Sequence, residues 1–239
     1  MTARANPIVA WALRQMKKRL LRAGFQLQRL PSGPPIVIPF WDEDATFDML
    51  YRQLAGHTLV DKTRCYMLYQ CAKQAAGISG DVAEVGVYRG GTARLICKAI
   101  ETTGKAAHLF DTFAGMPAVR PDKDIHREGD FNDTSIERVR AYLGDCRNVH
   151  LYQGIFPQTA APVAQKSFAF VHIDVDIYQS IVDCCAFFYP RMPSGAIMIF
   201  DDYGFISCPG VKQAVDAFLE DKPELPLYLP TGQCMVVRM

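Results

Sequence analysis

The spacing of hydrophobic positions changes at about residue 80. Within residues 44–76, apolar side chains recur at helical spacing, and Phe47, Leu50 and Leu54 share one stripe. From residue 80 onward, short runs of consecutive apolar residues alternate with stretches of helical periodicity. Such runs are typical of strands buried on both faces. The pattern predicts a helical region followed by an α/β unit with a mostly parallel, seven-stranded sheet covered by helices on both faces.

Five apolar runs are expected to form the body of this sheet, and two shorter ones follow near the end of the chain. Because ligands bind beyond the carboxyl ends of parallel strands, the residues after each strand are candidates for function. Helices are expected through about residue 100, at 134–144, through about residue 189 and at 209–220. The strands are expected at 81–87, 107–110, 148–152, 168–173 and 196–200, with short ones around 226–229 and 234–238.

The first 41 residues contain no Asp or Glu but several Arg and Lys. They predict a basic amphipathic helix, followed by a proline-rich linker at 31–35. Its apolar stretch is interrupted by charge and is not a secretory signal. The helix suits contact with a membrane surface or packing against protein, and both interpretations stay open. We therefore expect three regions: a basic helix and linker (1–35), a helical cap (36–79) and a ligand-binding core (80–239).

Overall composition narrows the class of protein. The formal net charge is +1, so a nucleic acid partner is not expected. Eight cysteines are present without a Cys-x-x-Cys pair, and no His/Cys spacing along the chain resembles a zinc site. Buried free thiols in a reducing cytoplasm are the favoured interpretation. No apolar run approaches the length of a membrane span. Homo-oligomer formation is left open.

A glycine-rich loop follows the first expected strand. Glu84 precedes Gly86 by two residues, and Gly90 and Gly91 open the next helix. Glycines in this position let the backbone turn tightly and approach a ligand. The spacing differs from the G-x-G-x-x-G of dinucleotide enzymes. A carboxylate beside the loop suits a cationic or hydroxyl-bearing ligand, and Asp111, at the end of the second strand, is a candidate for binding ribose hydroxyls.

Carboxylates also follow the fourth and fifth strands. Asp174 and Asp176 come after one strand, and Asp201 and Asp202 come after the other. If these strands are neighbours, the carboxylates meet at one sheet edge, where their repulsion is relieved by a hard cation with oxygen ligands. His172 is interpreted as a core histidine with satisfied hydrogen bonds. His126 is interpreted as an exposed loop histidine that could approach a substrate.

Five ordered motifs resemble those of the macrocin O-methyltransferase (TylF-type) family. They lie at residues 80–91, 110–117, 154–159, 174–180 and 201–204, within a resemblance that spans about residues 58–239. The resemblance implies a Rossmann-like class I methyltransferase fold with an N-terminal helical extension. It also implies methyl transfer from S-adenosyl-L-methionine to a hydroxyl group, often on a deoxysugar of a glycosylated natural product, with Mg²⁺ as a cofactor.

The resemblance also implies roles for single residues. Asp111 would bind the ribose of the cofactor. Related metal-dependent enzymes have a basic residue at the position of Ile177, so the proton would go to Asp174 or, as the less favoured choice, to Asp176. The methionine and ribose part of the cofactor would contact Glu84, Gly86, Tyr88, Gly90 and Thr92, and the metal ligands would be Asp174, Asp201 and Asp202.

Two other functions compete with methyl transfer. Asp174-Val175-Asp176 is a D-x-D motif, which predicts a metal-dependent nucleotide-sugar glycosyltransferase but leaves the glycine loop unexplained. A cofactor-binding or membrane-tethered scaffold without catalysis is the other alternative. The acceptor pocket is expected from residues 36–75 and 118–134, which leave a glycan, a glycosylated small molecule and a phenol open as acceptors.

Overall fold

The computed structural model describes Met16, Leu20 and residues 40–239. Apart from those two positions, the basic helix and linker predicted for residues 1–35 lie outside the described residues. Residues 40–239 form one compact unit, which includes both the predicted core and most of the predicted cap. Within the described residues, no helix is long and apolar enough to span a bilayer.

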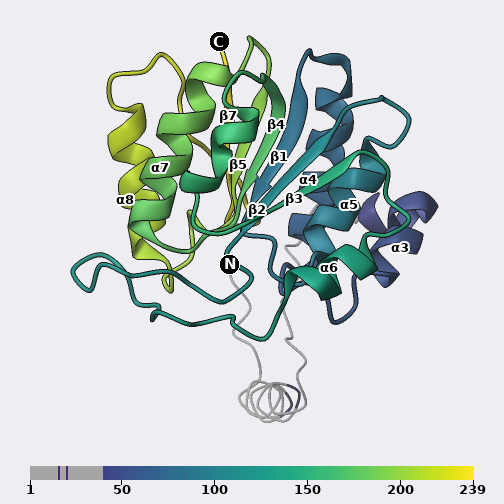
Figure 1. Ribbon diagram of the computed structural model, residues 1–239, viewed down its shortest axis with the longest axis horizontal. Coiled ribbons are helices and arrows are strands. Elements are labelled where there is room, and N and C mark those ends of the chain that lie inside the picture. Colours follow the sequence, from purple (N-terminus) through teal and green to yellow (C-terminus); the bar gives the residue numbers. More distant parts are fainter. Residues whose placement is uncertain (1–15, 17–19, 21–39) are drawn as a thin grey trace, which may run out of the picture. The chain divides into compact units, whose positions relative to one another are not determined.

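A seven-stranded sheet runs through the unit in the order β3-β2-β1-β4-β5-β7-β6 (Figure 1). All pairings from β3 to β5 are parallel, and β7 is antiparallel to both β5 and β6. The strands are β1 (Asp81–Val85), β2 (Ala107–Asp111), β3 (Val149–Gln153), β4 (Phe168–Ile173), β5 (Ile197–Phe200), β6 (Leu227–Tyr228) and β7 (Cys234–Val237). The predicted, mostly parallel sheet is confirmed. This is the architecture of the class I methyltransferase fold that the family resemblance implied.

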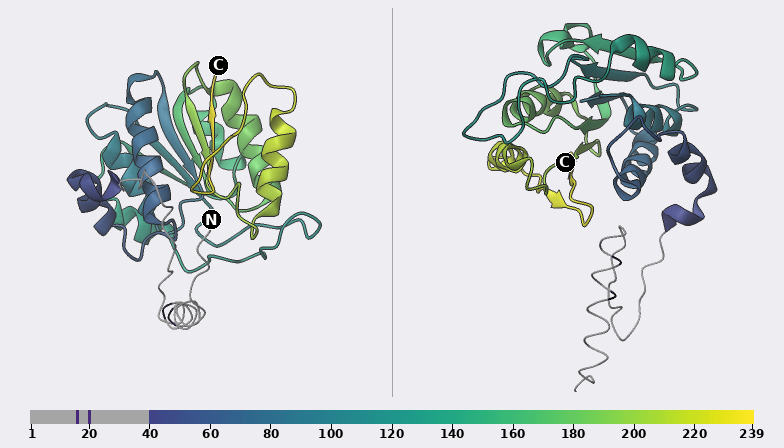
Figure 2. Two further views of the ribbon diagram at one scale, coloured as in Figure 1. Left: turned by 180° about the vertical axis from the view of Figure 1, so that it is seen from behind. Right: turned by 90° about the horizontal axis from the view of Figure 1, so that it is seen from below.

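Helices cover both faces of the sheet (Figures 1 and 2). On one face, α7 (Tyr178–Phe188) and α8 (Pro209–Leu219) pack against β4 and β5. On the other face, α4 (Lys62–Gln74) packs against β4, α5 (Gly91–Ala99) against β2 and α6 (Ile136–Tyr142) against β3. Every residue of β4 is buried, because this central strand has helices above and below it. Short 3₁₀ helices occur at Ala75–Gly77, Gln158–Val163 and Tyr189–Arg191.

The helical region before the sheet is divided, whereas the sequence indicated helix throughout 44–76. It consists of α2 (Phe40–Glu43), α3 (Ala45–Arg52) and α4, with a non-helical segment between α3 and α4. Asp61 begins α4 by accepting hydrogen bonds from the amides of Thr63 and Arg64. Gly56, at φ +78°, lies in the segment before it. A break here lets α3 pack against α4, with Phe47 fully buried between them.

Candidate active site

An open cleft lies at the carboxyl ends of the central parallel strands. Its empty volume is about 1100 Å³, including the part open to solvent. The walls come from the segment before α4, the loops after β1 and β2, the loop after β3, and the residues that follow β4 and β5. This is the edge of the sheet where the sequence placed the candidate residues. Of these, Gly86, Tyr88, Thr92, Asp111, Asp174, Asp176, Asp201 and Asp202 line the cleft.

Gly86 brings the loop after β1 into contact with the residues that follow β4. Its backbone has φ +89°, and a Cβ added to it would lie 1.7 Å from the carbonyl oxygen of Asp174. The amide of Asp174 donates to Val85 O at 2.9 Å, so β4 continues alongside β1 to this point. Only glycine allows this approach. The predicted cofactor loop and the first predicted metal ligand are therefore adjacent through their backbones.

Asp111 organises the loops around it. Its Oδ2 accepts hydrogen bonds from the amides of Val87 (2.7 Å) and Tyr88 (2.8 Å), and its Oδ1 accepts one from the amide of Phe113 (2.6 Å). Oδ2 uses both of its lone pairs in this way, whereas Oδ1 has a second lone pair, and Asp111 faces the cleft. The side chain can therefore hold the loops after β1 and β2 and still accept a hydrogen bond from a ribose hydroxyl.

The structure does not bring Glu84 or Gly90 to the cleft, although both were predicted to line the cofactor. Gly90 packs beside Val139 and Tyr142 at the start of α5, where its φ of +87° begins the helix. Glu84 lies within β1, and its side chain is fully buried. Its Oε1 is 2.7 Å from His172 Nδ1 on the neighbouring strand. Glu84 thus acts inside the sheet and not at the surface of the cleft.

His172 is the buried partner of two acidic residues. Its Nδ1 contacts Glu84, and its Nε2 lies 3.5 Å from Asp201 Oδ1, with all three side chains fully inaccessible to solvent. Burial by itself would lower the pKa of this imidazole, but the contacts with Asp201 and Glu84 outweigh it and raise the pKa to about 10. His172 is therefore a cation at neutral pH. The structure agrees with the predicted burial of His172, but its Nε2 has no hydrogen-bond partner, so the predicted satisfaction of both ring nitrogens is not met.

Asp201 differs from the other carboxylates of the cleft because cationic and amide donors already surround it. Arg64 donates from Nη1 to Oδ2, and Gln233 donates from Nε2 to Oδ1 at 2.8 Å. With His172 also close, both oxygens have protein partners. Arg64 comes from α4 and is hydrogen-bonded to Asp61, which begins that helix. As a result, the cap region supplies the positive charge beside Asp201, a contact that the sequence did not indicate.

Asp174, Asp176 and Asp202 form the acidic cluster of the cleft. One oxygen from each lies within 4.8 Å of the others. Burial raises the pKa of Asp174 and Asp202 well above the usual range, and repulsion between the carboxylates adds to this effect. Asp202 Oδ2 is buried and has no hydrogen-bond partner. Close oxygen ligands with an orphaned lone pair fit a hard divalent cation. The structure thus gathers Asp176 into the predicted metal group, while Asp201 is held by protein donors.

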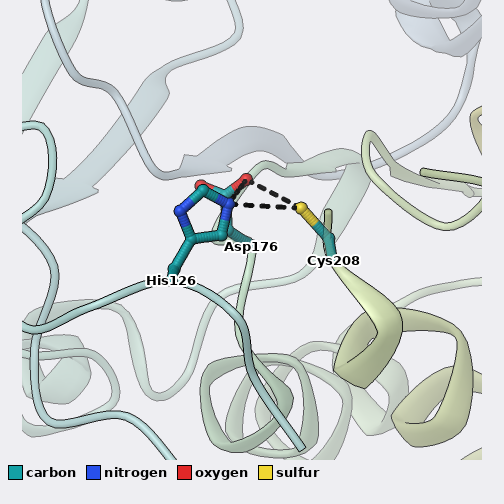
Figure 3. Close-up of side chains that lie close together, drawn as sticks. All are labelled: His126, Asp176 and Cys208. Carbon is teal, nitrogen blue, oxygen red and sulfur yellow. Dashed lines mark hydrogen bonds and ion pairs between the residues drawn. The ribbon is translucent and has the colours of Figure 1, made fainter. Parts of the chain in front are cut away.

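His126 is not the exposed loop histidine that the sequence indicated. Its side chain is 19% exposed, and its Nε2 lies 3.8 Å from Asp176 Oδ1. Cys208 Sγ is 3.6 Å from the same nitrogen and 3.3 Å from the same oxygen (Figure 3). The three residues come from the loop before α6, the segment before α7 and the residue before α8. Nothing in the sequence indicated that Cys208 lies beside the cleft.

Known proteins are similar to this chain in sequence and in fold. The profile of the macrocin-O-methyltransferase (TylF) family matches residues 42–226. Demethyldecarbamoylnovobiocin O-methyltransferase of Streptomyces niveus is 29% identical over 179 aligned positions, which cover 68% of each chain. The 8-demethyl-8-(2,3-dimethoxy-alpha-L-rhamnosyl)-tetracenomycin-C 4'-O-methyltransferase of Streptomyces olivaceus is 30% identical over 171 positions, covering 64% of this chain and 65% of the relative.

Similarity extends to a solved structure. The O-methyltransferase NovP superposes with a TM-score of 0.70 at 25% identity, covering 80% of this chain and 97% of NovP. The calicheamicin methyltransferase CalS11 shares the fold with a TM-score of 0.62 at 17% identity. The family profile covers the cap helices, the glycine loop and the strand-end carboxylates together. On this evidence the chain belongs to the macrocin-O-methyltransferase (TylF) family, whose members transfer methyl groups from S-adenosylmethionine to oxygen.

Proposed function

We propose that this chain methylates a hydroxyl of a sugar or of a glycosylated small molecule and that it requires a divalent metal ion. One observation carries the proposal: a single cleft joins the glycine loop after β1 to the acidic cluster after β4 and β5. The donor methyl group and the acceptor hydroxyl have to meet between these two regions. The family assignment favours methyl transfer over the nucleotide-sugar glycosyltransferase suggested by the D-x-D motif.

The cofactor half of the cleft would bind S-adenosylmethionine through its ribose and its methionine part. Asp111 would accept hydrogen bonds from the ribose hydroxyls, since its carboxylate is oriented by three backbone amides. Thr92 and Gly86 would contact the methionine part, because both line the cleft near the start of α5. The sulfonium methyl is already activated, so the chain's main tasks are to position the two reactants and to take up a proton.

The metal ion would be held by Asp174 and Asp202. Mg²⁺ is commonly bound by one or two carboxylates, with waters and substrate oxygens completing its coordination. Such an ion lowers the pKa of a hydroxyl that it binds. Asp201, which was also predicted as a ligand, would instead support the site from behind, because Arg64 and Gln233 occupy its oxygens.

Asp176 is our choice for the proton acceptor, in preference to Asp174. Asp174 is assigned to the metal ion in this proposal, and its charged neighbours include the carboxylates of Asp202 and Asp201. Asp176 lines the cleft and lies 3.8 Å from His126, whose other ring nitrogen is 3.3 Å from Asp130. Asp130 is 41% exposed on its side chain. A proton accepted by Asp176 can therefore reach solvent through His126.

The acceptor class is drawn from the relatives and from the aromatic side chains of the cleft. One relative is named for methylation of a rhamnosyl tetracenomycin and another for methylation of a novobiocin precursor. In this chain Tyr88 and Phe131 line the cleft with their rings edge to face, at a centroid distance of 5.9 Å. Aromatic faces of this kind pack well against the apolar face of a sugar ring.

Two measurements on the full chain test the proposal. The first is calorimetric titration with S-adenosylhomocysteine in magnesium buffer, for which we expect one saturable site. No binding to a folded protein would overturn the cofactor assignment, and hydrolysis of a UDP-sugar with Mn²⁺ would then support the glycosyltransferase. The second is methyl transfer from labelled S-adenosylmethionine to a panel of deoxysugar glycosides, before and after chelation of metal. Activity that survives chelation would overturn the metal requirement.

Variants separate the metal site from the cofactor site. Asp174→Asn and Asp202→Asn are expected to abolish turnover while leaving the affinity for S-adenosylhomocysteine within a few fold. Asp183→Asn is the matched control, because Asp183 lies on α7, bonded to Gln179 and outside the cleft. Wild-type turnover in Asp202→Asn would show that this carboxylate does not hold the metal.

A further inference from the structure

Three potential ligands of different chemistry meet beside the acidic cluster: the imidazole of His126, the carboxylate of Asp176 and the thiol of Cys208 (Figure 3). Cys208 is almost fully buried, and the other two side chains are each 19% exposed. Their ligand atoms are 3.3 Å (Sγ to Oδ1), 3.6 Å (Sγ to Nε2) and 3.8 Å (Nε2 to Oδ1) apart. The atoms therefore form a nearly equilateral triangle.

These distances are close to those of one face of a zinc coordination tetrahedron. Four-coordinate zinc lies about 2.3 Å from sulfur and about 2.0–2.2 Å from nitrogen or oxygen, so sulfur is roughly 3.5–3.7 Å from the other ligand atoms, and nitrogen is roughly 3.3–3.6 Å from oxygen. The distance between sulfur and nitrogen falls in its range, the one between sulfur and oxygen is slightly shorter, and the one between nitrogen and oxygen is slightly longer. An ion could enter with small side-chain adjustments. The fourth position of the tetrahedron would be open, since only three protein ligands are present.

Asp124 holds the three ligand-bearing segments together. Its Oδ1 accepts a hydrogen bond from Tyr178 N at the start of α7 (2.8 Å), and its Oδ2 accepts one from Arg120 N within its own loop (2.8 Å). At the start of α8, a Cβ added to Gly210 would lie 2.5 Å from Asp124 Oδ1. A buried carboxylate thus fixes His126, Asp176 and Cys208 relative to one another, because each is within two residues of one of these contacts.

The surroundings of two ligands also suit a metal ion. Cys208 is the residue before α8, and burial together with the nearby Asp176 and Asp202 raises the pKa of its thiol, so the thiol keeps its proton until a metal ion displaces it. His126 presents Nε2 to the triangle, while its Nδ1 is 3.3 Å from Asp130 Oδ2. A carboxylate on the second ring nitrogen fixes the orientation of a metal-binding histidine and raises its basicity, and such partners are usual in zinc sites.

We propose that His126, Asp176 and Cys208 bind Zn²⁺, or another borderline-soft divalent ion, at a site distinct from the one that would hold Mg²⁺. The donor set separates the two ions: a thiolate and an imidazole suit zinc, whereas Asp174 and Asp202 offer the oxygen ligands that magnesium prefers. The sequence showed no zinc spacing because the three ligands are distant in the chain and are brought together only by the fold.

The site would also control catalysis, a consequence that rests on the proposed function. Asp176 belongs both to this triangle and to the acidic cluster of the cleft. When it coordinates zinc, its oxygen is no longer available to accept a proton from the acceptor hydroxyl. Zinc bound here therefore inhibits methyl transfer, even when magnesium is saturating.

The test uses the full chain after bound metal has been removed and saturating Mg²⁺ has been added back. This protein is titrated with Co²⁺, a spectroscopic substitute for Zn²⁺. We expect one equivalent of Co²⁺ to bind, with intense visible bands typical of tetrahedral coordination and a thiolate-to-cobalt charge-transfer band in the near ultraviolet. Zn²⁺ should displace it. Cys208→Ser should remove the charge-transfer band, and Cys208→Ser and His126→Ala should each weaken Zn²⁺ binding by at least about tenfold.

Matched controls exclude loss of fold and adventitious binding. Cys146→Ser and His150→Ala change a cysteine and a histidine away from the triangle and should leave the spectrum unchanged. Binding of S-adenosylhomocysteine to each variant shows that the variant is folded and that its cofactor site is intact. The proposal is overturned if the charge-transfer band persists in Cys208→Ser, or if Co²⁺ binds only when Mg²⁺ is left out of the buffer, which would place the ion at the acidic cluster.

Discussion

His172 and Glu84 face each other across β4 and β1, with 2.7 Å between Nδ1 and Oε1 and no solvent access to either side chain. The two residues are directly paired in the parallel register of these strands. With Asp201 on the other side, the imidazolium lies between two carboxylates beneath the floor of the cleft. A polar link of this kind ties the two central strands to the end of β5.

The pH dependence of stability should reveal this histidine. Its pKa of about 10 in the folded protein is above the unfolded value of 6.5, so the folded state binds the proton more tightly. The stabilisation is complete below pH 6.5 and is lost as the pH rises through about 10. In urea unfolding at a series of pH values, the wild type should lose up to about 1.4 kcal/mol per pH unit more than His172→Gln across this window. Parallel pH profiles for the two proteins would contradict the assignment of a charged His172.

Gly86→Ala should be strongly destabilising. The new methyl group would overlap the carbonyl of Asp174, and φ +89° is unfavourable for alanine. We expect a loss of about 3 kcal/mol or more, which corresponds to roughly 6–12 °C in Tm for a domain of this size. Gly77→Ala is the control, since a Cβ there meets nothing within 4 Å. Equal melting temperatures for the two variants would show that the contact between the two loops is not needed.

Arg64→Met should weaken the attachment of α4 to the end of β5. The Arg64 side chain is only 11% exposed, and its loss leaves the fully buried Asp201 with His172 and Gln233 but without the cation that bonds its Oδ2. Breaking a buried pair in this way costs about 3–5 kcal/mol. Arg52→Met provides the comparison, because Arg52 is 80% exposed in its pair with Asp48 and its loss should cost less than about 1 kcal/mol. Denaturant unfolding measures both. Similar small losses would indicate that Arg64 is dispensable for the fold.

Asp111→Asn should weaken cofactor binding. An amide group would turn at least one N–H toward the amides of Val87, Tyr88 or Phe113, which now donate to the carboxylate. We expect the affinity for S-adenosylhomocysteine to fall by about tenfold or more, from the lost hydrogen bonds to a charged acceptor. Calorimetry can compare it with Asp122→Asn, a change at an exposed loop position. Unchanged affinity would exclude Asp111 from the ribose site.

The sheet was predictable because buried parallel strands are continuous apolar runs. The run at 168–173 coincides with β4, and the carboxylates after β4 and β5 meet because those strands are neighbours. The choice between adjacent carboxylates was not predictable. Asp201 turns toward the buried His172, whereas Asp202 joins the acidic cluster. Where a strand ends, the alternation of side chains ends too, and only tertiary packing decides which carboxylate joins the acidic cluster.

Contacts between segments that are distant in the chain could not be predicted from the sequence. Arg64 contacts Asp201 from α4, and Cys208 contacts His126 from the residue before α8. Neither pair is related by a helical or strand period, so no local pattern indicates it. Loop residues of this kind are positioned by the scaffold on which they lie. For Glu84 the sequence was misleading. Its position beside the glycine loop suggested a contact with the ligand, but its side chain is fully buried within β1.

The three amides that hold Asp111 have a consequence for the thermodynamics of ligand capture. They fix the loops after β1 and β2 during folding, before any ligand arrives. Most of the conformational entropy of these loops is therefore lost at that earlier stage. A ligand that enters this half of the cleft gives up its own freedom without also ordering the protein, so binding there approaches that of a rigid, preorganised receptor.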